Sequence, residues 1–111
     1  MGEQRDAIPP GTLDILILKT LTRSGKLHGF EIAEAIRQTS SEILLVEEGS
    51  LYPALQRMFM KSWLTGEWGK TKENRRARYY QITAVGRRHL AAELAAYDRV
   101  ARAIGRVLFA E

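Results

Sequence analysis

The 111-residue chain contains the stretch Gly49-Ser50-Leu51-Tyr52-Pro53-Ala54-Leu55-Gln56-Arg57-Met58, which has the pattern of an amphipathic helix. Leu51, Leu55 and Met58 recur at the spacing of one buried stripe. The side chains outside this stripe carry hydrogen-bond donors: Ser50, Tyr52, Gln56, Arg57 and Lys61. Such a face can read base edges and phosphates in DNA, although an ordinary helix with a solvated polar face has the same pattern.

Two residues indicate where this helix begins. Ser50 is a residue type favoured at a helix N-cap, because its hydroxyl can accept a bond from a free backbone N–H. Pro53 would then lie in the first turn, where its missing N–H removes no helical bond. We therefore expect Ser50 to cap the helix.

Two shorter helices are predicted upstream, after an extended lead-in at residues 8–11. The first should run from its cap, Thr12, to about Arg23, with an inner stripe of Leu13, Leu16, Ile17 and Leu21. The second should run from His28 to about Gln38, with four residues facing inward: Phe30, Ile32, Ala33 and Ile36. A short strand at residues 44–46 would lead into the third helix. Three helices in this order form a helix-turn-helix core.

After Ser62 the hydrophobic pattern changes from helical to alternating. Residues 63–68 and 78–82 predict two strands of a β-hairpin joined by a polar loop over residues 69–76. Cations gather in this loop and just beyond it: Lys70, Lys72, Arg75, Arg76 and Arg78. A basic hairpin directly after such a helix indicates the wing of a winged-helix domain. A solvated charge run is the alternative, but Glu73 alone offsets the loop cations, which favours contact with phosphates.

Thr83 is expected to cap a long last helix that carries an apolar seam. Its members recur in alternating steps of four and three, the spacing of a coiled coil: Leu90, Leu94, Tyr97, Ala101, Ile104 and Leu108. So long a helix has few partners within its own chain, so we expect the seam to form a homodimer, with some packing on the first helix. Residues 1–83 would then be a winged helix-turn-helix DNA-binding domain and residues 84–111 a dimerisation helix. The predicted fold class is mainly α with a small β-hairpin.

Charge is distributed unevenly along the chain. Residues 1–48 carry five Lys or Arg against eight Asp or Glu, whereas residues 49–83 carry seven against two and residues 84–111 carry five against three. The positive charge therefore lies in the third helix and the hairpin, as expected for a surface that approaches a polyanion.

Several classes of function find no support in the sequence. The two histidines, His28 and His89, lie in different predicted elements, and no metal-ligand spacing or glycine-rich phosphate loop is present. His28 fits better as a structural donor at a helix start. The absence of cysteine excludes disulfides and thiolate metal sites. We therefore expect that the protein is not an enzyme and that it binds no metal or cofactor. The first six residues contain no apolar export segment, so we expect a cytoplasmic protein without a membrane anchor.

Five segments together resemble the PadR family of bacterial transcriptional regulators, in its short form with a single C-terminal helix. They are Gly11-Thr12-Leu13-Asp14-Ile15-Leu16-Ile17-Leu18, His28-Gly29-Phe30-Glu31-Ile32, Glu48-Gly49-Ser50-Leu51-Tyr52-Pro53-Ala54-Leu55, Glu67-Trp68-Gly69, and Tyr79-Tyr80-Gln81-Ile82-Thr83 with Gly86. The resemblance implies a homodimeric repressor that binds palindromic operators and, in several members, leaves DNA when a small, often aromatic, molecule binds. We expect such an effector to lie between the subunits near Tyr97. A winged-helix module that binds an acidic protein is the alternative function.

Three departures from the family pattern concern the third helix and its surroundings. Phe30 stands where the family usually has Tyr, and Met58-Phe59 replaces the usual Leu-Glu. Ser62 replaces a usual Gly at the turn into the hairpin, where a left-handed backbone would cost more for Ser. Phe59 would either pack beneath the wing or leave an apolar spot on the surface.

Overall fold

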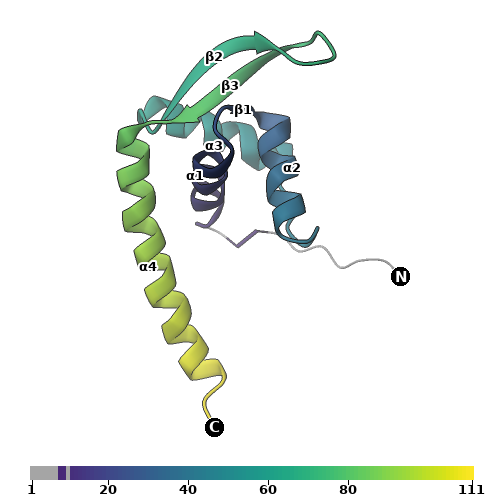
Figure 1. Ribbon diagram of the computed structural model, residues 1–111. Helices are drawn as coiled ribbons and strands as arrows, with labels where there is room; N and C mark the ends of the chain where they lie inside the picture. The colour runs from purple at the N-terminus through teal and green to yellow at the C-terminus, as the bar shows by residue number, and fades with distance from the viewer. Residues whose placement is uncertain (1–7, 10) are drawn as a thin grey trace, which may run out of the picture.

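The computed structural model describes residues 8, 9 and 11–111, and within them it is mainly helical with one small antiparallel sheet. The elements follow in the order α1 (Leu13–Ser24), β1 (Leu27–His28), α2 (Gly29–Thr39), α3 (Glu48–Met60), β2 (Leu64–Lys70), β3 (Arg76–Ile82) and α4 (Ala84–Leu108). Helices α1 to α3 cluster beneath the hairpin, and α4 extends away from them as a long arm (Figure 1). The predicted fold class is confirmed. The predicted lead-in at residues 8–11 and the first six residues lie partly or wholly outside the described residues.

The sheet has one strand more than the predicted hairpin. Its order is β1-β3-β2, with Leu27 opposite Tyr80 in the added pair. The strand predicted at residues 44–46 is wrong, since only Leu44 forms an isolated bridge. The backbone N–H groups of Ile43 and Leu44 instead donate to the carbonyl and hydroxyl of Ser40, at 3.2 and 3.0 Å. The chain therefore turns after α2, where the apolar run at residues 44–46 predicted a short strand.

Helix α3 begins earlier than predicted. Its N-cap is Glu47, whose carbonyl accepts bonds from the N–H groups of Ser50 and Leu51 at 3.0 and 2.9 Å. Ser50 therefore lies in the first turn, and its predicted role as the cap is wrong. Pro53 consequently lies inside the helix. Its missing N–H leaves the exposed carbonyl of Gly49 without the usual helical donor.

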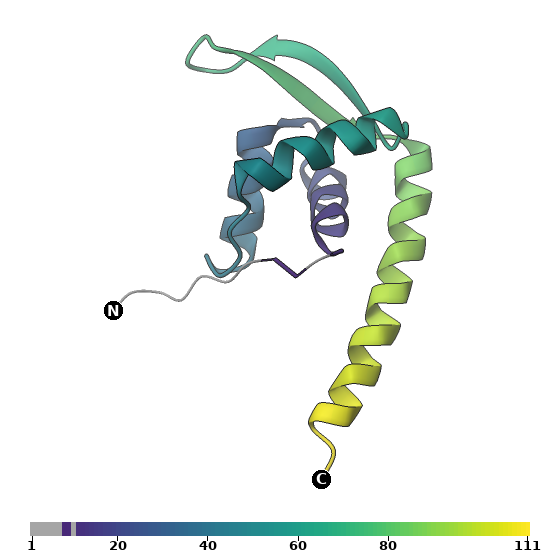
Figure 2. The same cartoon turned by 180° about the vertical axis from the view of Figure 1, so that it is seen from behind.

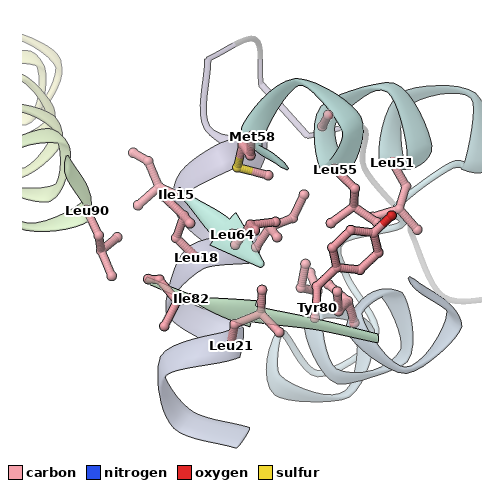
Figure 3. Packing of buried hydrophobic residues seen from close by; sticks show 14 residues of the cluster. Ile15, Leu18, Leu21, Leu51, Leu55, Met58, Leu64, Tyr80, Ile82 and Leu90 are labelled. Carbon is pink, nitrogen blue, oxygen red and sulfur yellow. The ribbon is translucent and has the colours of Figure 1, made fainter. Parts of the chain in front are cut away.

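The core is a single cluster that draws on three helices, two strands and the start of α4 (Figure 3). Its buried members are Ile15, Ile17, Leu18, Leu21, Ile32, Ile36, Leu51, Ala54, Leu55, Met58, Leu64, Tyr80, Ile82 and Leu90. Leu51, Leu55 and Met58 are the predicted inner stripe of α3, and each such side chain contributes roughly 1.5–3 kcal/mol when buried. The core therefore fixes α3 with its opposite face turned to solvent.

Phe30 is an exception among the predicted inward residues. Its side chain is 64% exposed, whereas Ile32 and Ile36 of the same helix are buried. Phe30 is the second residue of α2, and the helical turn places it on a different side from the stripe that Ile32 begins. The prediction that Phe30 faces inward is wrong.

The turns around the hairpin show where backbone strain occurs. Ser62 adopts φ of 63°, the left-handed conformation predicted from its place at the turn into β2. Both strands are longer than predicted, so only residues 71–75 form the loop, and Lys70 and Arg76 face each other as a cross-strand pair. Asn74 in this loop is also left-handed, with φ of 64°.

Helix α4 begins at the predicted cap. The hydroxyl of Thr83 accepts from the N–H of Gly86 at 2.9 Å and donates to the carbonyl of Ser62 at 2.7 Å. Gly86 and Leu90 are buried, so the first turns of α4 belong to the core. In the described part of the chain, no helix has the length and apolar character needed to cross a bilayer.

Candidate nucleic-acid interface

The outward face of α3 carries the predicted polar side chains. All five predicted positions are exposed: Ser50, Tyr52, Gln56, Arg57 and Lys61. They are exposed because the apolar stripe on the other side of the helix is held in the core. Gln56 offers an amide that can both donate and accept hydrogen bonds.

Arg57 is held by an acid from another helix. Its Nη2 donates to Oδ1 of Asp14 on α1 at 2.5 Å. Asp14 is half-buried, and the Arg57 side chain remains 47% exposed. This pair partly neutralises Arg57 and draws its guanidinium towards α1.

Tyr52 lies against the start of α2 and close to Tyr80. A Cβ added to Gly29 would come within 2.7 Å of Tyr52 Cε1, so the glycine leaves the space in which the ring lies. Burial raises the pKa of the Tyr80 phenol, the nearby Arg78 opposes this shift, and Tyr52 adds to it.

The tip of the hairpin is a basic loop organised by Thr71. The N–H of Thr71 donates to the carbonyl of Arg75 at 2.8 Å, and the Thr71 hydroxyl accepts from the N–H of Arg75 at 3.2 Å. Lys70, Lys72 and Arg75 are all exposed around this turn. Since Lys70 also faces Arg76 across the strands, like charges lie close together. An anion placed at the tip would relieve this repulsion.

Arg76 and Arg78 lie on strand β3 and contact aromatic rings. The guanidinium carbon of Arg76 is 4.2 Å from the ring centre of Trp68, and that of Arg78 is 4.3 Å from the ring centre of Phe59. Phe59 therefore packs beneath the wing, one of the two positions predicted for it. Arg76 is exposed, but Arg78 is half-buried, unlike the cations at the tip.

A cleft of about 840 Å³ separates the hairpin tip from the starts of α2 and α3. Figure 2 shows the hairpin running above α3, with its tip on the side where the helix begins. The wing side of the cleft is lined by Lys70, Lys72 and Arg75, and the helical side by His28, Phe30 and Tyr52. Three carboxylates, Glu31, Glu48 and Glu73, also line it. Tyr52 and the wing cations, predicted from separate patterns, therefore share one cleft.

Seven of the cleft residues were not predicted as site residues, and three of these carry rings: His28, Phe30 and Tyr79. The backbone N–H of His28 donates to the Glu31 carboxylate at 3.1 Å, which agrees with its predicted structural role at a helix start. Its ring also packs edge-on against Tyr79, with ring centres 5.2 Å apart. The signal for this contact was the pairing of residues 27–28 with β3, which is too short to produce an alternating pattern.

The seam of α4 divides into a buried start and an exposed remainder. Leu90 packs in the core of its own chain, with only 7% of its surface exposed, because it lies near Ile15 and Ile82 (Figure 3). The other predicted members are exposed: Leu94, Tyr97, Ala101, Ile104 and Leu108. Between α1 and α4 lies an apolar groove of about 360 Å³, whose lining includes Ile15, Leu16, Leu94 and Tyr97.

His89 contacts an aromatic ring in a place distant from the cleft. It stacks on Trp63 with ring centres 3.7 Å apart. Among the described residues, no group of three or more acidic, histidine or cysteine side chains could hold a metal ion.

The arrangement of an exposed helix face beside a basic hairpin agrees with comparison to known proteins. The model of the transcriptional regulator PadR-like family matches residues 17–92. The chain belongs to this family. PadR-like regulators are non-enzymatic DNA-binding proteins, so the protein is a DNA-binding transcriptional regulator.

Individual relatives support the same assignment. A transcriptional regulator from Clostridium thermocellum is 26% identical, with a TM-score of 0.79 over 91% of this chain and 95% of its own. A PadR family regulator from Clostridium difficile is 27% identical, with a TM-score of 0.73 over 88% of this chain and 99% of its own. An uncharacterised protein of Lysinibacillus sphaericus is 28% identical over 86 residues, or 78% of each chain.

Proposed function

We propose that this PadR-like regulator is a cytoplasmic repressor that binds a palindromic operator as a homodimer and leaves DNA when a small molecule binds. The observation that carries the proposal is the cleft in which Tyr52 of α3 faces the cations of the wing tip, with Gln56 and Arg57 exposed further along the same helix. A duplex placed there would meet hydrogen-bonding side chains on one side and cations on the other. That combination suits a groove and its flanking phosphates.

The two elements would have different tasks. Helix α3 enters the major groove, where Tyr52, Gln56 and Arg57 meet base edges. Ser50 and Lys61, near the two ends of the helix, contact the backbone. The wing meets phosphates through Lys70, Lys72, Arg75 and Arg76. Arg57 must leave Asp14 to make a base contact, because the carboxylate offsets its positive charge and turns its guanidinium towards α1.

A homodimer would cover the apolar surface of α4. The end of this helix exposes Ile104, Val107, Leu108 and Phe109, from 52% for Ile104 to 81% for Phe109. The groove between α1 and α4 offers a matching apolar surface, with Ile15, Leu16 and Leu94 among its lining residues. We infer that the end of α4 in one protomer packs along this groove in its partner. A two-fold dimer would place half-sites about one helical turn apart, ~34 Å or a multiple of it.

The same groove is a candidate site for an effector. Its volume of about 360 Å³ lies at the lower end of the usual range for small-molecule sites, about 300–1,000 Å³. Tyr97 supplies an aromatic ring and a hydroxyl there. A small aromatic molecule that enters the groove would move α4 and change the distance between the two α3 helices of the dimer. A Tyr97→Phe variant, which keeps the ring in the seam but removes the hydroxyl, should keep DNA binding and weaken its release by such a compound, as measured by fluorescence anisotropy of a labelled operator.

The division of work between helix and wing can be tested with two variants. Gln56→Ala should weaken binding to the preferred operator and relax preference at one base pair by about 1–3 kcal/mol. Arg75→Ala should weaken binding to preferred and random duplexes alike. It should also make the dependence of log affinity on log salt shallower by roughly 0.9 for each phosphate that the wing no longer neutralises. Glu111→Gln is a control that changes charge beyond the end of α4. If the wing variant loses sequence preference while the helix variant keeps it, the two roles are assigned the wrong way round.

A further inference from the structure

Cations and aromatic rings alternate between the end of α3 and the outer part of the wing. The Arg78 guanidinium carbon lies 4.3 Å from the ring centre of Phe59 on α3 and 5.8 Å from that of Trp68 on β2. Arg76 lies over the same Trp68 ring at 4.2 Å. These contacts connect α3 to both strands of the hairpin, in the order Phe59, Arg78, Trp68, Arg76. We call these four residues the cation–aromatic row.

Gly66 provides the space that Arg78 occupies. A Cβ at residue 66 would come within 2.7 Å of Arg78 Nε and 3.3 Å of its guanidinium carbon. In the register of the hairpin, Arg78 faces Trp68, and Gly66 faces Tyr80. The guanidinium therefore lies across the face of β2 towards α3, where the absence of a side chain leaves room for it.

Ring contacts, not acids, hold Arg78 in place. Among the described residues its Nε is buried and has no hydrogen-bond partner, and no carboxylate forms an ion pair with it. A planar guanidinium can stack on aromatic faces, which an ammonium group does less well. Phe59 is one of the positions at which the chain departs from the pattern of its family. An acid there would hold Arg78 by an ion pair, whereas a ring holds it by stacking.

We propose that the cation–aromatic row sets the position of the wing relative to α3, so that Arg78 is a positioning residue and not a phosphate ligand. The consequence for DNA rests on the proposed function, in which the wing tip contacts phosphates. The base of the hairpin stays anchored in the core through Leu64, Tyr80 and Ile82. Removal of one ring from the row releases the outer part of the hairpin, and the tip cations then no longer reach the DNA backbone together. Replacing Phe59, which carries no charge, should therefore weaken the contact between the wing cations and DNA phosphates.

The first test measures the wing without DNA. The chain has no cysteine, so nitroxide labels can be attached at Glu73→Cys on the wing tip and Gln38→Cys at the end of α2. Electron–electron double resonance then gives the distance distribution between the labels, with labelled chains diluted in unlabelled chains. We expect a narrow distribution in the parent and in Phe59→Tyr, which keeps a ring. Phe59→Leu and Arg78→Lys should broaden it, and an unchanged distribution in both would overturn the proposal.

The second test measures affinity for a random-sequence duplex at several salt concentrations. Phe59→Leu should make the salt dependence shallower by roughly 0.9 for each phosphate that the wing no longer reaches, and at least two phosphates should be affected. Adding Arg75→Ala to Phe59→Leu should then change the slope little. Met60→Leu, a neutral change at the adjacent exposed residue, should leave it unchanged, and Phe59→Tyr should restore it. Urea unfolding midpoints establish that each variant is folded.

Two results would contradict the proposed role of Arg78. If Phe59→Leu keeps the parental slope and Arg75→Ala adds its full effect, the row does not position the wing. If Arg78→Lys keeps the slope while Arg78→Ala lowers it by the equivalent of one phosphate, Arg78 itself binds a phosphate. A parent protein without salt-dependent duplex binding would instead reject the proposed function, and the label distances would still decide whether the row holds the wing.

Discussion

Among single residues, Ser62 is held in a left-handed backbone conformation, and Arg57 is held by an acid on another helix. The left-handed conformation of Ser62 followed from its place at a turn where a glycine is usual, and the structure confirms it with φ of 63°. The pairing of Arg57 with Asp14 could not be predicted, because the two residues are 43 positions apart in the sequence. Such contacts depend on how helices pack, which residue patterns do not specify.

Replacing Ser62 with glycine should stabilise the fold. A left-handed conformation costs a non-glycine residue roughly 1–2 kcal/mol, and the greater freedom of glycine in the unfolded chain offsets about half of this. We expect a gain of up to about 1 kcal/mol in the free energy of unfolding, measured with urea. Ser24→Gly, at an exposed helical position, is the control and should destabilise. A decrease in stability for Ser62→Gly would show that the Ser62 side chain contributes more than its backbone conformation costs.

Releasing Arg57 should strengthen non-specific binding. Asp14→Asn removes the acid that holds Arg57, so the salt dependence for a random duplex should become steeper by about 0.9, equivalent to one more neutralised phosphate. Stability should change by about 1 kcal/mol or less, because both side chains of the pair remain in contact with solvent. Asp98→Asn is a matched control, since Asp98 pairs with Arg102 at 2.8 Å far along α4. Equal effects of both variants would mean that only net charge matters.

At the scale of elements, the long periodic segments were predicted well and the short ones were not. Helices α1, α3 and α4 follow from apolar periodicity over three or more turns. The strand expected at residues 44–46 is absent because Ser40 binds the backbone there, and β1, with two residues, is too short to produce a pattern. The start of α3 was predicted too late. Ser50 suits both an N-cap and the first turn of a helix, and Pro53 is usual in a first turn but lies inside this helix.

The junction between wing and α4 depends on the absence of a side chain at Gly86. A Cβ there would lie 2.9 Å from Ile82 Cγ1 and closer still to the Trp63 carbonyl oxygen, which is backbone and cannot move aside easily. Gly86→Ala should therefore cost about 2 kcal/mol or more, a typical effect of overpacking. Gly49→Ala in α3 meets open space and should instead stabilise by about 0.5–1 kcal/mol. Urea unfolding of both variants decides the matter, and equal effects would contradict this packing at Gly86.

For the molecule as a whole, the apolar seam of α4 predicted that this helix needs a partner. It did not predict how much of the helix is free to meet a second copy. Leu90 completes the core of its own chain, so the surface available to a second copy begins at Leu94. Periodicity could not separate these residues, because the seam continues unchanged while the core beside it ends. For the candidate site, Tyr52 lies in one cleft with three of the predicted cations, Lys70, Lys72 and Arg75, whereas Gln56 and Arg57 are exposed on α3 outside it. The assignment of these residues to DNA stays a prediction.

The dimer should depend on the exposed part of α4. Leu94→Asp combined with Ile104→Asp should yield monomers. Burying each of the two apolar side chains stabilises the dimer by roughly 1.5–3 kcal/mol, and burying a carboxylate in its place costs additional free energy. Ala92→Asp with Ala103→Asp adds the same charges to the opposite side of the helix and should leave the dimer intact. Sedimentation velocity distinguishes the two species. A double Leu94 and Ile104 variant that stays dimeric would place the interface elsewhere.

In the proposed function, two copies of α3, presented by a two-fold dimer, read base pairs in adjacent turns of DNA. This arrangement can be tested by selection of bound sequences from a random duplex pool. We predict enrichment of an inverted repeat whose half-sites are centred about 10–10.5 base pairs apart, or a multiple of this. Enrichment of a single unrepeated site, or of no sequence at all, would contradict the claim.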